Sequence, residues 1–176
     1  MRLIVLLAAL AMPLVAFLSQ RGFFGPDNGT MSDRYPTLLV ASGYAFSIWG
    51  LIFLWDIAFG AWQLLSRSVL QEGLTRVRRG AALGFALTAA WMPVFSTGHF
   101  WVALAIIWAA LICLARAAII LSADERMPAG KRWLAWAPLS LHAGWLALAA
   151  FLNTAQVIVA YDLLPGVAML SWSLAT

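Results

Sequence analysis

Long apolar runs, separated by short segments that carry the charges, dominate the sequence. The first run covers residues 3–20, and the second covers residues 36–65 with Asp56 as its one charge. A helix needs roughly 17–25 apolar residues to cross the hydrocarbon core of a bilayer. Both runs therefore predict transmembrane helices.

The third run is long enough for two helices. Between Arg79 and Arg116 lie 36 uncharged residues, which would make about 54 Å of helix, nearly twice the ~30 Å hydrocarbon core. Small polar residues and a glycine at Ser96–His99 suit a tight turn. We therefore predict one span over residues 80–96 and another over residues 100–122.

A fifth span is expected over residues 133–160. Asp162 and Pro165 follow it, and the apolar segment 167–176 is too short to cross a membrane. The sequence thus predicts an all-α membrane protein with a single transmembrane domain over residues 1–176. That domain is a five-helix bundle with a short apolar C-terminal segment.

Composition agrees with this class of protein. Hydrophobic residues make up 64% of the chain and charged residues 10%, and the mean hydropathy of +0.89 lies outside the range of soluble domains. The net charge of +4 does not indicate a nucleic-acid partner, because the basic residues fall in predicted loops. Cys113, the single cysteine, excludes a disulfide framework and a cysteine-based metal cluster.

Basic residues gather in two of the predicted loops, one after the second span and one after the fourth: Arg67, Arg76, Arg78, Arg79, Arg126, Lys131 and Arg132. Cytoplasmic loops carry an excess of Lys and Arg. Both loops and the N-terminus are therefore expected in the cytoplasm, with the protein in a bacterial inner membrane. The loop at residues 21–35 and the hairpin at residues 96–100 then lie outside.

Four tryptophans lie in the middle of the apolar runs: Trp49, Trp91, Trp108 and Trp145. Membrane tryptophans usually lie at the water interfaces, whereas an indole N–H at the bilayer centre needs an interhelical acceptor or a ligand. The rings could fill gaps between helices, or they could stack a flat apolar molecule. In the second interpretation, Trp49, Trp91 and Trp145 line one cavity in the outer half of the bundle, beneath the loop at residues 21–35.

Eight further polar residues fall within spans or at their ends: Asp56, Thr88, His99, Arg116, Ser140, His142, Asn153 and Gln156. Intramembrane polar groups are functional candidates by default. Asp56 and Arg116 lie at similar depths, counted from the basic loops, so we expect an ion pair between them. The alternative is that Arg116 extends to the headgroups.

His142 admits two interpretations. A neutral imidazole within a span could be an axial ligand to the metal of a haem or chlorophyll, or it could make an interhelical hydrogen bond. The sequence holds no other metal-binding pattern, no glycine-rich phosphate loop and no hydrolase motif. It therefore predicts no catalytic residue.

Three segments resemble the TspO/MBR family, the tryptophan-rich sensory proteins related to the mitochondrial translocator protein. Residues 88–95 (TAAWMPVF) resemble the Asn-x-x-Trp-x-Pro-x-Phe signature of the third helix. Residues 138–145, followed by Asn153, resemble the fifth-helix pattern, and residues 46–49 resemble the second. The likeness covers about residues 35–160. It implies a five-helix bundle, commonly dimeric, with a pocket under the loop between helices one and two.

The chain also departs from the family pattern. Thr88 stands in place of the motif asparagine, and His142 stands where an aromatic residue such as tyrosine is expected. A proline precedes Trp145 by seven residues instead of four, so the chain resembles a divergent branch. Tyr161 is followed by Asp162 and no basic residue, so a cholesterol-type motif is missing there.

The tryptophans and the resemblance together predict a pocket formed by eight residues: Trp49, Trp91, Pro93, Phe95, His142, Trp145, Ala149 and Asn153. The expected function is binding, transport or sensing of a flat apolar ligand, and the resemblance implies a tetrapyrrole of the porphyrin or haem type. A porphyrin-modifying enzyme and an auxiliary subunit of a larger membrane pigment–protein complex are the alternatives. No cofactor is required, and the expected partners are membrane lipids, a hydrophobic small molecule and a second copy of the chain.

Overall fold

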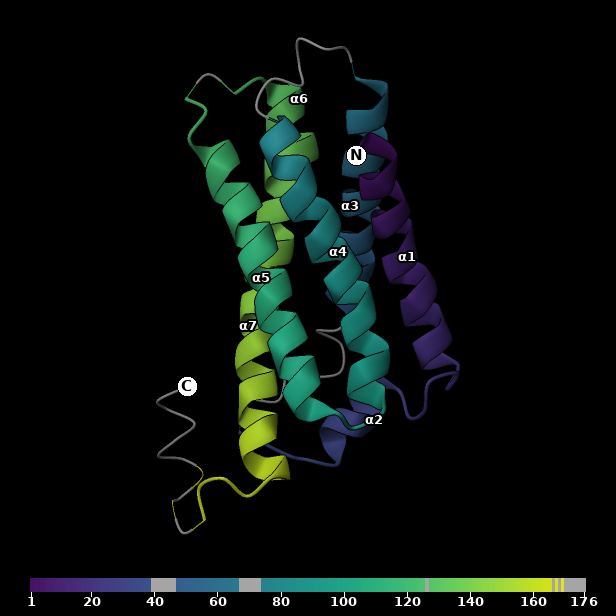
Figure 1. Cartoon of the computed structure of the whole chain (residues 1–176), viewed down its shortest axis with the longest axis vertical. Coiled ribbons are helices and arrows are strands. Elements are labelled where there is room, and N and C mark those ends of the chain that lie inside the picture. Colours follow the sequence, from purple (N-terminus) through teal and green to yellow (C-terminus); the bar gives the residue numbers. More distant parts are fainter. Residues whose placement is uncertain (39–46, 67–73, 126, 166, 168, 170–176) are drawn as a thin grey trace.

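The computed structural model describes residues 1–38, 47–66, 74–125, 127–165, 167 and 169. Within these ranges the chain is helical with no strand, and its long helices run up and down in one bundle (Figure 1). The elements in chain order are α1 (Arg2–Gln20), α2 (Asn28–Asp33), α3 (Ile48–Leu65), α4 (Leu74–Ser96), α5 (Phe100–Ser122), α6 (Ala129–Lys131), the π-helical turn η3 (Arg132–Trp136) and α7 (Ala137–Ala160).

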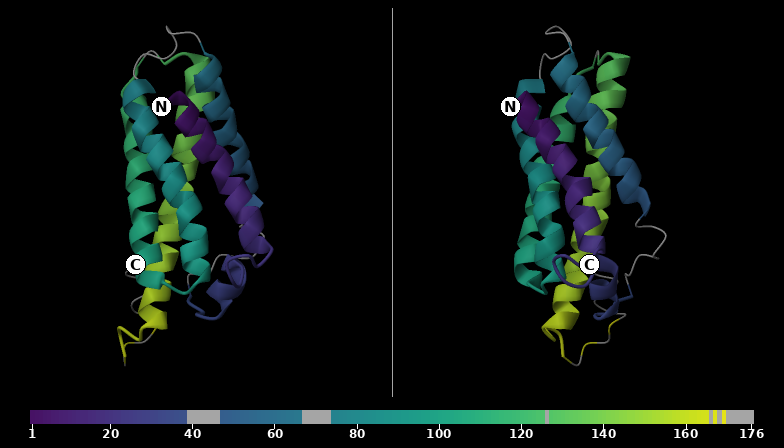
Figure 2. Two further views of the ribbon diagram at one scale, coloured as in Figure 1. Left: turned by 45° about the vertical axis from the view of Figure 1, so that its right-hand side comes forward. Right: turned by 90° about the vertical axis from the view of Figure 1, so that its right-hand side faces the viewer.

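Each long helix packs against at least two others. Helix α4 contacts α1 and α5, while α7 contacts α5 and α3, and α1 contacts α3. The short helix α2 packs against α4 at the end of the bundle opposite the N-terminus (Figures 1 and 2). The loop after the first long helix therefore returns over one end of the bundle.

Four helical stretches are long and apolar enough to cross a membrane: Arg2–Gln20, Ile48–Leu65, Phe100–Ser122 and Ala129–Ala160. The protein is an all-α membrane protein. Helix α4 is not among the four, and three arginines lie in its first two turns. The span predicted over residues 80–96, and with it the count of five, therefore stays a prediction.

The predicted boundaries hold best where turn residues mark them. Helix α5 has the predicted bounds, and Gly98, with φ +77°, makes the left-handed turn between α4 and α5. The predicted break at residues 96–99 is thus confirmed. At the end of α7, Asp162 takes the left-handed conformation (φ 47°).

Three boundaries differ from the predictions by more than one residue. The last helical stretch begins at Ala129, four residues before the predicted start. Residues 36–38 are not helical and α3 begins at Ile48, because this stretch belongs to the segment that returns over the bundle end; residues 39–46 lie outside the described ranges. Helix α4 begins six residues before the predicted span, since a charged side chain need not end a helix. The C-terminal segment 167–176 lies, apart from residues 167 and 169, outside the described ranges.

Glycines let α4 approach α5 closely. Gly80 and Gly84 are four residues apart and so lie on one face of α4. A Cβ at Gly84 would come 2.5 Å from Cδ2 of Leu114, and a Cβ at Gly80 would come 3.1 Å from the Cys113 carbonyl oxygen. Small residues at this spacing let membrane helices pack backbone to backbone.

We predict that Gly84→Ala weakens this interface. The new methyl group must displace the buried Leu114 side chain, so the free energy of unfolding in detergent should fall by about 1–3 kcal/mol. Gly144→Ala on α7 is the matched control, because no atom beyond its chain neighbours and the backbone of its own helix turn lies within 4 Å of its Cβ position. Equal stability of the two variants would contradict the close approach of α4 and α5.

Candidate functional site

A pocket lies beneath α2, among the helices α3, α4 and α7. The space between its walls is about 440 Å³, a figure that includes open solvent at its mouth. The residues that line it are Asn28, Ser32, Trp49, Trp91, Phe95, Trp145, Leu148, Ala149, Leu152, Asn153 and Gln156.

The structure brings together six of the eight residues predicted for the pocket: Trp49, Trp91, Phe95, Trp145, Ala149 and Asn153. Pro93 and His142 are not in the lining. Sequence reasoning missed five lining residues, of which Leu152 and Gln156 follow Trp145 at helical spacing and could have been found from that period. Asn28 and Ser32 carried no such signal, because they come from α2.

Aromatic rings form the walls of the pocket. The rings of Trp49 and Trp145 meet at 89° with their centroids 5.9 Å apart, an edge-to-face contact that aromatic pairs favour. On α4, the ring of Trp91 stacks on that of Phe95, with the centroids 5.0 Å apart. Trp49 and Trp145, on helices of opposite direction, thus lie at the same depth.

The indole N–H groups differ in their hydrogen bonds. Nε1 of Trp91 donates to Oδ1 of Asn153 at 3.0 Å, and Nε1 of Trp108 donates to Oγ1 of Thr154 at 3.4 Å. Both bonds join neighbouring helices, as the dry interior requires. Nε1 of Trp145 is buried and has no acceptor among the described residues.

Helix α2 covers the pocket, and Asp27 caps its N-terminus. Oδ1 of Asp27 accepts hydrogen bonds from the backbone N–H groups of Gly29 and Thr30 at 2.9 and 3.0 Å, and Oδ2 accepts from the Thr30 hydroxyl at 2.6 Å. The hydrogen bonds from Thr30 lower the pKa of Asp27 below its ordinary value. An ionised cap is therefore favoured at neutral pH.

Hydrogen bonds also fasten α2 to the helices beneath it. Nε2 of Gln156 on α7 donates to Oγ of Ser32 at 2.6 Å. Oγ of Ser96, at the end of α4, donates to Oδ1 of Asn28 at 3.0 Å. Met31 is buried between these contacts. Side-chain hydrogen bonds therefore join the cover of the pocket to both α4 and α7.

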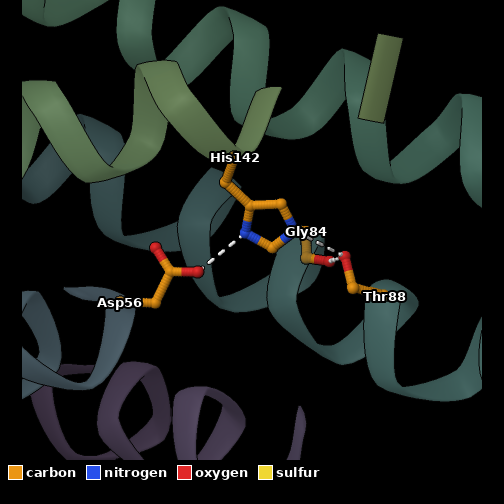
Figure 3. Close-up of polar contacts among 4 residues, drawn as sticks. All are labelled: Asp56, Gly84, Thr88 and His142. Atoms are coloured by element: carbon orange, nitrogen blue, oxygen red, sulfur yellow. Dashed lines mark hydrogen bonds and ion pairs between the residues drawn. The ribbon is translucent and has the colours of Figure 1, made fainter. Parts of the chain in front are cut away.

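The predicted ion pair between Asp56 and Arg116 is wrong. Oδ2 of Asp56 lies 2.7 Å from Nδ1 of His142 on α7, and both side chains are fully buried (Figure 3). Arg116 is exposed on the outer side of α5. Counting residues gave the depth of the two charges but not the direction in which each leaves its helix.

His142 makes interhelical hydrogen bonds on both sides. Its Nε2 lies 3.4 Å from Oγ1 of Thr88 on α4, opposite the bond to Asp56. The ring is stacked on Phe85 and meets Trp49 edge to face, with both centroid distances 5.8 Å. The described residues contain no group of three side chains that could hold a metal ion. Of the two interpretations, the geometry favours the hydrogen-bonding one.

Comparison with known proteins identifies a family. A family model described as TSPO-like protein matches residues 2–176, essentially the whole chain. No match was found among curated proteins or among solved structures. The family match spans every helix of the bundle, including the pocket and the helix that covers it.

We predict that Trp91 and Asn153 are energetically coupled. Asn153→Leu leaves the indole N–H of Trp91 without an acceptor, which should lower the free energy of unfolding by about 1–3 kcal/mol. In a Trp91→Phe background the same change should cost less, because no N–H is left unpaired. A double-mutant cycle of unfolding in detergent measures the coupling, and strictly additive losses would contradict it.

A second prediction concerns the stability of α2 at low pH. The lowered pKa of Asp27 means that its carboxylate stabilises α2 above the ordinary carboxyl pKa, and that this contribution is lost as the pH falls through the lowered value. At low pH the backbone amides of Gly29 and Thr30 should then lose protection from hydrogen exchange. This loss is measured after correction for the intrinsic effect of pH on the exchange rate. Asp27→Asn is the control, because asparagine caps a helix without titrating. If protection depended on pH in the same way in both proteins, the Asp27 carboxylate would not be what stabilises α2.

Proposed function

The chain belongs to the family of TSPO-like proteins, and on that premise we propose that it binds a flat apolar ligand beneath α2, for transport or sensing. The proposed ligand is a tetrapyrrole of the porphyrin or haem type. The observation that carries the proposal is the indole of Trp145, which lines an aromatic pocket while its buried N–H has no acceptor among the described residues. A buried donor left unpaired costs about 1–3 kcal/mol, and a ligand acceptor that meets this N–H after a turn of the indole would remove that cost.

The lining of the pocket supports this class of ligand. Trp49, Trp145 and the leucines of α7 offer apolar and aromatic surface, while Asn28, Ser32 and Gln156 supply neutral polar groups on the side of α2. Sites for small molecules commonly combine an apolar lining with a few placed polar groups. A ligand with a flat apolar body and polar acceptors at its edge fits this division.

The same lining favours binding over catalysis. None of the described residues around the pocket has a side chain that titrates near neutral pH, and acid–base catalysis requires such a group within reach of the substrate. The buried Asp56–His142 pair lies behind the wall that Trp49 forms.

We also propose an orientation, with the basic end of the bundle and the N-terminus in the cytoplasm of a bacterium. Arg76, Arg78 and Arg79 at the start of α4 and Lys131 at the end of α6 lie at the same end as the N-terminus (Figure 1). An excess of basic residues marks the cytoplasmic side. The pocket and α2 then open toward the outer face of the inner membrane.

Titration of the purified chain with protoporphyrin IX in lipid nanodiscs tests the proposed function. We expect saturable binding, seen as a shift of the porphyrin absorbance together with tryptophan quenching. Replacing both Trp49 and Trp145 by leucine should weaken the affinity at least about tenfold, equivalent to ~1.4 kcal/mol. Trp101→Leu is the matched control, because Trp101 is exposed and stacks on Tyr161 away from the pocket.

The outcomes separate the alternatives. Unchanged affinity in a folded Trp49→Leu/Trp145→Leu variant would overturn the proposed pocket. A new absorbing product that forms with time would favour a porphyrin-modifying enzyme. Neither binding nor product would favour the role of an auxiliary subunit.

A further inference from the structure

Two ionisable side chains lie in the middle of the bundle, behind the pocket wall. Asp56 and His142 are both 0% exposed, and Oδ2 of Asp56 is 2.7 Å from Nδ1 of His142. On the far side of the ring, Nε2 lies 3.4 Å from Oγ1 of Thr88, which in turn donates to the carbonyl oxygen of Gly84 at 2.9 Å (Figure 3). The four groups form one chain of hydrogen bonds across α3, α7 and α4.

The Thr88 hydroxyl determines where the imidazole carries a hydrogen. A hydroxyl has one hydrogen to donate, and that of Thr88 is used in the bond to Gly84. The oxygen therefore presents a lone pair to Nε2 of His142, so Nε2 must be the donor in this contact. If Nε2 carried no hydrogen, two lone pairs would face each other, or Thr88 would have to give up its bond to Gly84.

The position of this hydrogen fixes the charge of the pair. An imidazole with a single hydrogen, on Nε2, has a lone pair on Nδ1, and the hydrogen between Nδ1 and Oδ2 must then belong to a neutral Asp56. An imidazolium would instead face a carboxylate. In both arrangements the pair holds one proton more than a carboxylate beside a neutral imidazole, and its net charge is zero. A dry interior strongly disfavours an unneutralised charge.

The second oxygen of Asp56 favours the neutral acid. Oδ1 is buried and has no donor among the described residues. A charged carboxylate oxygen left without a donor in the interior is much less stable than the carbonyl oxygen of a neutral acid. The proton thus lies on the Asp56 side of the hydrogen bond to His142.

The other ionisable groups on the packed helices are distant from the pair or point outward. Helices α3 and α7 hold no further titratable side chain within their bounds. On α4, Nε of Arg78 donates to Gln63, which is seven residues, about 10 Å, from Asp56 along α3. Arg2 of α1 lies at that same level, because its carbonyl oxygen accepts from Gln63.

The ionisable groups of α5 and η3 do not contact Asp56 or His142. The titratable groups of α5 and η3 are the half-buried Cys113 and the exposed Arg116 and Arg132. Arg78 would favour a carboxylate, but only from a distance. No described cation contacts Asp56.

We propose that Asp56 and His142 form an intramembrane proton-binding site, which holds one proton and is electrically neutral in the folded protein. Release of that proton would leave a net negative charge beside Trp49, whose ring meets the imidazole edge to face at 5.8 Å and also lines the pocket. Trp49 is therefore a direct contact between the proton-binding pair and the pocket wall.

Nuclear magnetic resonance of histidine nitrogens tests the proposal directly. The chain has two histidines, and His99→Gln at the exposed hairpin leaves His142 as the only signal. In ligand-free protein labelled with ¹⁵N-histidine in nanodiscs at neutral pH, Nε2 should carry a hydrogen and Nδ1 should be hydrogen-bonded. Thr88→Val should shift the Nε2 resonance. A single hydrogen on Nδ1 would overturn the proposal.

Two substitutions provide a test by stability. Asp56→Asn can present an amide N–H to Nδ1 and a carbonyl oxygen in place of Oδ1, as a neutral acid would, whereas Asp56→Leu offers neither group. Asp56→Asn should keep nearly the unfolding temperature of the unchanged protein in detergent, and Asp56→Leu should lower it clearly. Equal losses in the two variants would contradict a neutral pair. Neither experiment uses a porphyrin, so their failure is distinguishable from failure of the proposed function.

Discussion

Polar groups inside this bundle have little access to water, so partners within the protein stabilise them, and the arrangement of the helices depends on those partners that lie on another helix. Trp91 of α4 reaches Asn153 of α7 at one level, and Asp56 of α3 reaches His142 of α7 at another. Apolar packing alone is a weak guide to helix position in a bilayer, because lipid tails are as apolar as the side chains. These hydrogen bonds therefore define how α7 faces α3 and α4.

Helix α4 connects the packing of the bundle to its pocket. Its glycine face allows close contact with α5, and the carbonyl oxygen of Gly84 accepts the bond from Thr88 that orders the buried histidine. Further along the same helix, Trp91 and Phe95 form one wall of the pocket. A single helix thus positions the proton-binding pair and the proposed ligand site relative to each other.

The sequence was sufficient for the class of fold and for most of the pocket, because both depend on periodic apolar residues and on the tryptophans within them. It failed for the partner of Asp56, since residue counting gives depth in the membrane but not the face of the helix. It also failed to place α2 residues such as Asn28 in the pocket. Their contacts arise only when the loop folds back over the bundle end, and no local pattern records that return.

The central claim is that the space beneath α2 is a specific site for one flat apolar molecule. Native mass spectrometry of the full chain, released from nanodiscs after incubation with protoporphyrin IX, measures this most directly. We expect one porphyrin per chain at saturation, with no second adduct as the porphyrin concentration rises. Adducts that increase in number without saturation, or a chain that carries only lipid, would contradict it.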